Sequence, residues 1–107
     1  MNQQEFNESL QTGGLVLFDF YTDWCEPCKI LDPILDDVKR RMGSDLAIHK
    51  INSDENPRLA QEYHIKSVPT LMLFRNGKLL WRMAGFDTAD KLEKIIRKHS
   101  EQGSDSR

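Results

Sequence analysis

The two cysteines of this chain lie in one short segment, Cys25-Glu26-Pro27-Cys28, whose spacing suits thiol–disulfide chemistry. The segment follows an apolar run and precedes residues with helical periodicity, so we expect the pair at the start of a helix. Unpaired backbone N–H groups there stabilise a thiolate, the nucleophile of disulfide exchange. We therefore predict that Cys25 is the exposed nucleophile and that Cys28, one turn further, is the shielded resolving thiol. Pro27 fits the first helical turn.

Two other roles for the cysteine pair stay open at this point. A structural disulfide would close a very short loop and would gain little chain entropy, and a domain of 107 residues can build a core without one. A structural zinc site needs four ligands, but His49, His64 and His99 are far from the pair in sequence. The residues favour redox chemistry over both.

An acidic residue interrupts the strand that leads to the cysteines. Residues 15–21 are almost continuously apolar, which is typical of a strand covered on both faces, yet Asp19 lies within them. Burial disfavours the charged form of a carboxyl, so the pKa of Asp19 is predicted to be raised. Such a group can accept a proton from Cys28 near neutral pH. The alternative is a core acid that is satisfied by hydrogen bonds alone.

Helical and strand periodicities alternate along the chain and predict the order α-β-α-β-α-β-β-α. The predicted segments are a helix from Asn2 to Gly13, a strand at 15–21, a helix from the cysteines to Gly43, a strand at 46–51, a short helix from Asn56 to about Tyr63, strands at 70–74 and 78–83, and a helix capped by Asp87 or Thr88.

These segments predict an α/β fold with a mixed four-stranded sheet and helices on both faces. The first two strands should be parallel, because a helix joins them, and the third should be parallel to one of them. Asn76-Gly77 predicts a tight hairpin that makes the last strand antiparallel. We expect one domain over residues 1–100 and a disordered polar tail over 101–107.

The composition argues against several classes of partner. The 15 basic and 17 acidic residues give a net charge of −2, so neither nucleic acid nor an anionic membrane is an expected partner. The polar start lacks the apolar core of a secretory signal, and no run approaches the roughly 18 apolar residues of a membrane span. We therefore expect a cytoplasmic protein.

Several motifs together resemble the thioredoxin family over nearly the whole chain. The segment Trp24-Cys25-Glu26-Pro27-Cys28-Lys29 resembles that family's Trp-Cys-Gly-Pro-Cys-Lys centre. The other matching residues, in chain order, are Phe18-Asp19-Phe20, Pro33, Lys50, Val68-Pro69-Thr70, Asn76-Gly77 and Gly85. The resemblance implies a thioredoxin fold and a protein-disulfide reductase that cycles between a dithiol and a Cys25–Cys28 disulfide. It also implies disulfide-containing protein substrates, a thioredoxin-reductase-like electron donor and no bound cofactor.

The resemblance assigns further residues to the site. Pro69 should be cis and face the cysteines, leaving the backbone of Val68 free to pair with an extended substrate. Lys50 should lie near Asp19 and could pair with it. The substrate surface implied by the family comprises Trp24, Glu26, Pro27, Val68, Pro69, Ala84 and Gly85.

Glu26 departs from the family, which usually has glycine at this position. A glutamate in the first helical turn is favoured by the helix dipole. Its charge also disfavours a neighbouring thiolate, which would raise the pKa of Cys25 and make the couple more reducing. Solvent screening should keep this effect small, and Glu26 could matter more for the choice of partner.

A second departure lies at the N-terminus, where most members of the family have an extra strand. Without that strand, residues 46–51 should form an edge of the sheet. An uncovered edge can pair with another chain, so we expect a weak dimer or partner contact there.

Two alternatives to a reductase are kept. An oxidase or isomerase of the same fold is one, although Pro27 argues against it, because such relatives tend to carry histidine there. A non-enzymatic thioredoxin-like binding adaptor is the other, and the two cysteines with Asp19 argue against it.

Overall fold

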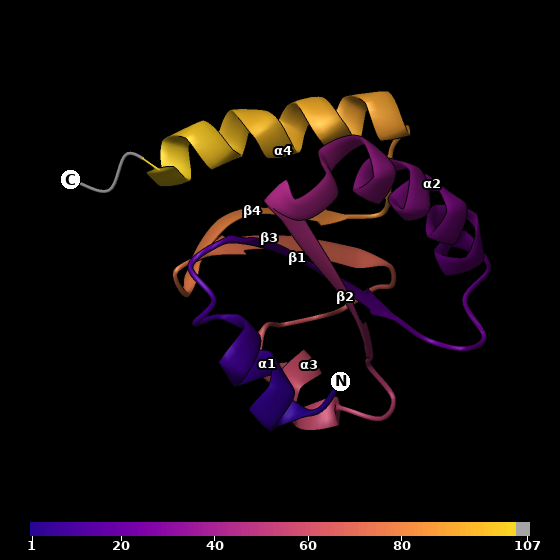
Figure 1. Cartoon of the computed structure of the whole chain (residues 1–107). Coiled ribbons are helices and arrows are strands. Elements are labelled where there is room, and N and C mark those ends of the chain that lie inside the picture. The colour runs from indigo at the N-terminus through magenta and orange to yellow at the C-terminus, as the bar shows by residue number, and fades with distance from the viewer. Residues whose placement is uncertain (105–107) are drawn as a thin grey trace.

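The computed structural model describes residues 1–104, and Figure 1 shows the chain as a sheet between two layers of helices. The elements are α1 (Gln3–Ser9), β1 (Leu15–Tyr21), α2 (Glu26–Met42), a 3-10 turn (Gly43–Asp45), β2 (Leu46–Asn52), α3 (Pro57–Glu62), β3 (Thr70–Arg75), β4 (Lys78–Ala84) and α4 (Ala89–Ser104). The predicted order of elements is confirmed, and each predicted strand lies within one or two residues of the observed one.

The strands are arranged in the order β2-β1-β3-β4. β1 and β2 are parallel, as predicted, and β3 and β4 form the predicted antiparallel hairpin. The prediction that the third strand is parallel to an earlier one is wrong, because β3 pairs antiparallel with β1. α3 has only 6 residues, or about 9 Å of helix, whereas a 7-residue strand spans about 23 Å. The chain therefore enters β3 at the end of the sheet where β2 finishes.

Alternation along the strands divides the core into two layers. Leu15 and Leu17 of β1 pack in a cluster with Leu31 and Leu35 of α2 and with residues of α4. Val16, Phe18 and Phe20 point to the opposite face and pack with α1 and α3. Helices therefore cover both faces of the sheet, as predicted (Figure 1). Because side chains alternate, Asp19 faces the same layer as Leu17, beneath α2.

Local signals set the ends of the helices. Asn2 and Glu5 form the predicted capping box at α1, each side chain accepting the backbone N–H of the other at 2.8 Å. At the other end of the chain, α4 continues to Ser104, four residues past the predicted domain boundary at residue 100. The remainder of the predicted tail, residues 105–107, lies outside the described residues.

β2 is an edge of the four-stranded sheet, as predicted for this segment. None of the helices in residues 1–104 is both long enough and apolar enough to cross a membrane.

Candidate active site

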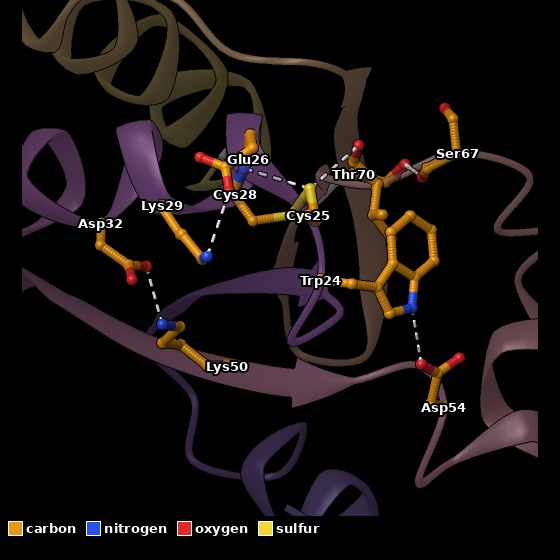
Figure 2. Close-up of a disulfide and its surroundings, with 11 residues drawn as sticks. Trp24, Cys25, Glu26, Cys28, Lys29, Asp32, Lys50, Asp54, Ser67 and Thr70 are labelled. Carbon is orange, nitrogen blue, oxygen red and sulfur yellow. Dashed lines mark hydrogen bonds and ion pairs between the residues drawn. A yellow bond between two sulfur atoms is a disulfide. The ribbon is translucent and has the colours of Figure 1, made fainter.

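The cysteines lie at the start of α2, shortly after the end of β1 (Figure 2). Cys25 is the N-cap of α2 and Cys28 belongs to its first turn, with Pro27 between them. The two form a disulfide, with their Cα atoms 5.3 Å apart. The backbone N–H of Cys28 donates a hydrogen bond to Cys25 Sγ at 3.1 Å. An N–H group of the helix start thus points at Cys25 sulfur, which would stabilise a thiolate there once the disulfide is reduced.

Exposure does not distinguish the two cysteines in this oxidised state. Cys25 is 3% exposed and Cys28 4%, so the expectation of an exposed Cys25 is not met here. The loop before β3 covers it, since Cys25 Sγ lies 3.5 Å from the carbonyl oxygen of Val68. What separates the cysteines is their place on the helix. Cys28 shares the inward face of α2 with Leu31 and Leu35, whereas Cys25 precedes the helix.

The loop opposite the cysteines contains a cis peptide bond between Val68 and Pro69, as the resemblance implied. The Pro69 carbonyl accepts the backbone N–H of Gly85 at 2.8 Å, which fixes the loop beside the end of β4. Gly85 has a φ of +99°, a conformation that favours glycine. Ala84, the last residue of β4, is the register partner of Thr70. Among the described residues, the N–H of Val68 donates no hydrogen bond, so it is free to pair with a bound chain.

Trp24 is the most exposed large apolar side chain among the described residues, at 71%. Its indole Nε1–H donates a hydrogen bond to Asp54 Oδ2 at 3.0 Å, which orients the ring beside the cysteines (Figure 2). Trp24 and Val68 line a shallow cavity of about 190 Å³. Asp54 was not predicted as a site residue, and nothing in the sequence near it indicates the contact.

Asp19 is fully buried, and neither of its carboxyl oxygens has a hydrogen-bond partner among the described residues. Burial raises the pKa of Asp19 from 3.8 to about 7, while Lys50 lowers it and Asp32 raises it. The predicted rise is therefore confirmed. The alternative, a core acid satisfied by hydrogen bonds, would need partners that none of the described residues supplies.

Lys50 does not pair with Asp19, although the two are register partners in β1 and β2. Its Nζ instead lies 2.7 Å from Asp32 Oδ1 on α2 (Figure 2). The same Nζ lies 4.7 Å from the centre of the Tyr21 ring. A flexible lysine on an edge strand can leave its neighbour for a carboxylate that is already solvated, and the Asp32 side chain is 46% exposed. Asp32 was also missed, although its position one turn after Cys28 could have drawn attention to it.

Glu26 is on the surface of the site, with its side chain 80% exposed. Its carboxylate lies 3.2 Å from Lys29 Nζ, so part of its charge is balanced locally (Figure 2). The expectation of a small effect on Cys25 rests on the same exposure.

The family model for thioredoxin matches residues 1–98. The thioredoxin of Chlamydia caviae is 41% identical over 100 residues, which cover 94% of this chain and 96% of that protein. The thioredoxin of Bacillus subtilis is 38% identical over 86 residues, covering 80% and 83% of the two chains. The crystal structure of mitochondrial thioredoxin 3 from Saccharomyces cerevisiae in its oxidized form superposes with a TM-score of 0.82, at 31% identity, over 91% of this chain and 90% of that one.

The cysteine pair at a helix start, the opposing cis-proline loop and these similarities agree on the chemistry. The chain belongs to the thioredoxin family and is a thiol–disulfide oxidoreductase that reduces protein disulfides through Cys25 and Cys28.

Proposed function

We propose a separate role for each of the residues Cys25, Cys28 and Asp19 in the reaction. The Cys25 thiolate attacks one sulfur of a substrate disulfide, so a Cys25–substrate disulfide forms and one substrate thiolate leaves and takes a proton. The Cys28 thiol then gives its proton to the Asp19 carboxylate and attacks Cys25 Sγ. The mixed disulfide breaks, the second substrate thiolate leaves, and the cysteines, having given two electrons to the substrate, are left as the Cys25–Cys28 disulfide.

The observation that carries this assignment is the hydrogen bond from the Cys28 N–H to Cys25 Sγ at 3.1 Å. It gives Cys25, not Cys28, a donor at the helix start, and a donor to the charged form lowers a thiol pKa. Asp19 suits the role of proton acceptor because its raised pKa, about 7, lies near neutral pH.

Substrate contact is proposed for the surface around Cys25. An extended segment would pair with the free backbone N–H of Val68, as a strand added beside the Pro69 loop. Trp24 and Pro27 would contact the substrate from the cysteine side, and Ala84 and Gly85 from the end of β4. Glu26 would contribute a negative charge at the rim and favour partners with a basic residue nearby.

Regeneration requires an external donor of two electrons, which we propose is a thioredoxin-reductase-like protein. The proposed cycle needs no bound cofactor, because the dithiol itself carries the electrons. A reducing compartment such as the cytoplasm would keep that dithiol in its active form, so we place the protein there, in electron transport to protein disulfides and in redox homeostasis. Cell fractionation tests the location.

Trapping the mixed disulfide tests the order of attack. With insulin as substrate and dithiothreitol as donor, Cys25→Ser and Cys28→Ser should both abolish turnover. Only Cys28→Ser should accumulate a covalent complex with a disulfide substrate on a non-reducing gel. A complex that accumulates with Cys25→Ser instead would reverse the two roles.

Self-association through β2 is also proposed, because β2 is an edge of the four-stranded sheet and an uncovered edge can pair with another chain. We expect a weak dimer that sedimentation detects as the protein concentration rises. A monomer over the whole range would contradict it.

A further inference from the structure

The salt bridge between Asp32 and Lys50 lies at a cavity beside the resolving cysteine. The cavity has a volume of about 240 Å³ and is lined by Cys28, Asp32 and Lys50. Asp32 comes from α2 and Lys50 from β2, so the bridge of 2.7 Å joins the helix that carries the cysteines to the edge of the sheet (Figure 2). Both side chains are nearly half exposed, which places the bridge at the solvent side of the cavity.

Two carboxyl groups compete for the ammonium group of Lys50. Asp19 is the register partner of Lys50, so the two backbones are neighbours and both side chains point toward α2. Yet Asp19 keeps both oxygens without a hydrogen-bond partner in the described part of the chain, while Lys50 reaches Asp32. The ring of Tyr21, 4.7 Å from Lys50 Nζ, supports this outward position.

We propose that Asp32 is a positioning residue for the resolving step, because its salt bridge holds Lys50 at the cavity beside Cys28 and keeps that ammonium group off the carboxyl of Asp19. The inference rests on the proposed function of Asp19 as the acceptor of the Cys28 proton. An ammonium held against Asp19 would stabilise its ionised form and make it a weaker base. With Lys50 held by Asp32, Asp19 can exchange its proton near neutral pH.

Other charges near Asp19 do not account for this arrangement. The titratable side chains that line the cavity are Tyr21, Asp23, Cys28, Lys29, Asp32 and Lys50. Lys29 is engaged with Glu26 at 3.2 Å, and β3 places the apolar Leu71 beside Asp19 on the other side of β1. Lys50 is therefore the ammonium group positioned to act on Asp19, and Asp32 is the carboxylate that holds it.

Titration of Asp19 in the oxidised protein tests the proposal directly, because disulfide-bonded cysteines do not titrate. The carboxyl carbon of Asp19 is followed by NMR as a function of pH. Replacing Asp32 by Asn should lower the Asp19 midpoint by about one pH unit, since Lys50 is released toward Asp19. An unchanged midpoint would overturn the proposal.

A double-mutant cycle separates positioning from the charge of Asp32 itself. In a Lys50→Met background, Asp32→Asn should shift the Asp19 midpoint by less than half as much as it does with Lys50 present. Equal shifts in both backgrounds would mean that Asp32 acts through its own charge and would overturn the proposal. Asp36→Asn, one turn further along α2, is the matched control and should leave the midpoint unchanged. Far-ultraviolet circular dichroism confirms that each variant is folded.

A kinetic experiment links this shift to the chemistry. A symmetrical aryl disulfide with a coloured thiolate gives one release on attack by Cys25 and a second when Cys28 resolves the mixed disulfide. The rate of the second release is measured as a function of pH. In Asp32→Asn, the midpoint of this pH profile should fall by the same amount as the Asp19 midpoint. If Asp19→Asn leaves the second phase unchanged, the proposed function of Asp19 fails, while the NMR cycle still decides whether Asp32 positions Lys50. If the Asp19 midpoint shifts but the pH profile of the second release does not, the proposed link between Asp32 and the resolving step is overturned.

Discussion

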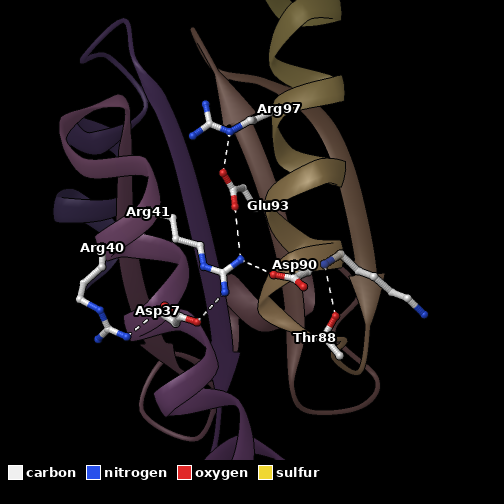
Figure 3. Close-up of polar contacts among 8 residues, drawn as sticks. Asp37, Arg40, Arg41, Thr88, Asp90, Glu93 and Arg97 are labelled. Atoms are coloured by element: carbon white, nitrogen blue, oxygen red, sulfur yellow. Dashed lines mark hydrogen bonds and ion pairs between the residues drawn. The ribbon is translucent and has the colours of Figure 1, made fainter.

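The charged groups near the C-terminus of α2 differ in exposure and pairing from the carboxyl group buried beneath its N-terminal half. Near its C-terminus, Arg41 pairs with Asp37 on the same helix and with Asp90 and Glu93 on α4, and Glu93 also pairs with Arg97 (Figure 3). These groups are on the surface and each has a partner of opposite charge. Below the N-terminal half of α2, Asp19 is fully buried and has no hydrogen-bond partner within the described residues.

The difference indicates what each region does. Solvated ion pairs with ready partners join α2 to α4 at little cost, and each contributes little to stability. A buried carboxyl without a partner costs stability, and the proposed role of Asp19 as a proton acceptor would account for keeping such a group beneath the cysteine helix. The pKa values follow the same division. Arg41 lowers the pKa of Asp90, whereas burial raises the pKa of Asp19 to about 7.

The largest effect is expected from Asp19→Asn. The folded protein keeps a proton on Asp19 between about pH 4 and 7, whereas the unfolded chain has lost it, so the free energy of unfolding falls as the pH rises through this range. The full difference in pKa corresponds to about 4 kcal/mol. Relative to Asp19→Asn, the oxidised parent should therefore lose about this much between pH 4 and pH 8 in urea unfolding.

Asp36→Asn, an exposed position on α2, is the control and should keep the pH dependence of the parent. If the free energy of unfolding varies with pH in the same way in the parent and in Asp19→Asn, then burial of Asp19 does not destabilise the folded state. The contrast between the two ends of α2 would then be broken.

A smaller effect is expected from Arg41→Met at the other end of the helix. Its ion pairs are open to water, so Tm should fall by no more than a few degrees, and the difference should vanish at about 1 M salt, where the Debye length is about 3 Å. The variant should reduce disulfides at the same rate as the parent protein. A loss of activity with an unchanged Tm would contradict a purely structural role for this network.

The smallest effect is expected from Glu26→Gly at the start of α2. Removing the negative charge should lower the pKa of the Cys25 thiol in the reduced protein, but by less than about half a pH unit, because Glu26 is exposed and paired with Lys29. The rate of alkylation of Cys25 against pH measures it. A Glu26→Gln variant separates the charge from the backbone effect of glycine, and no change in either variant would leave Glu26 without a role in thiolate chemistry.

Much of the site could be predicted from local pattern. An apolar strand followed by Cys-x-x-Cys and a helix places Cys25 at an N-cap, because strand and helix periods are properties of consecutive residues. A carboxyl inside that strand must be buried, so the raised pKa of Asp19 was also within reach. The direction of β3 could not be predicted in this way. It depends on the end of the sheet at which the chain emerges from the short α3.

Lys50 illustrates the same limit at the level of one side chain. Its position beside Asp19 was implied by the family resemblance, but its partner depends on Asp32, which lies eighteen residues earlier and on a different element. The burial of Cys25 is a similar case, because the cover comes from Val68, forty-three residues later in the chain.

The redox motif, the order of elements and the buried acid follow from the amino-acid sequence, since each is a pattern among residues close together in the chain. Which carboxylate holds Lys50, how β3 runs and what covers Cys25 become known from the packed fold. Those outcomes are competitions between groups that are distant in sequence, and the free energy of each alternative depends on burial and distance that only the packed sheet and helices set.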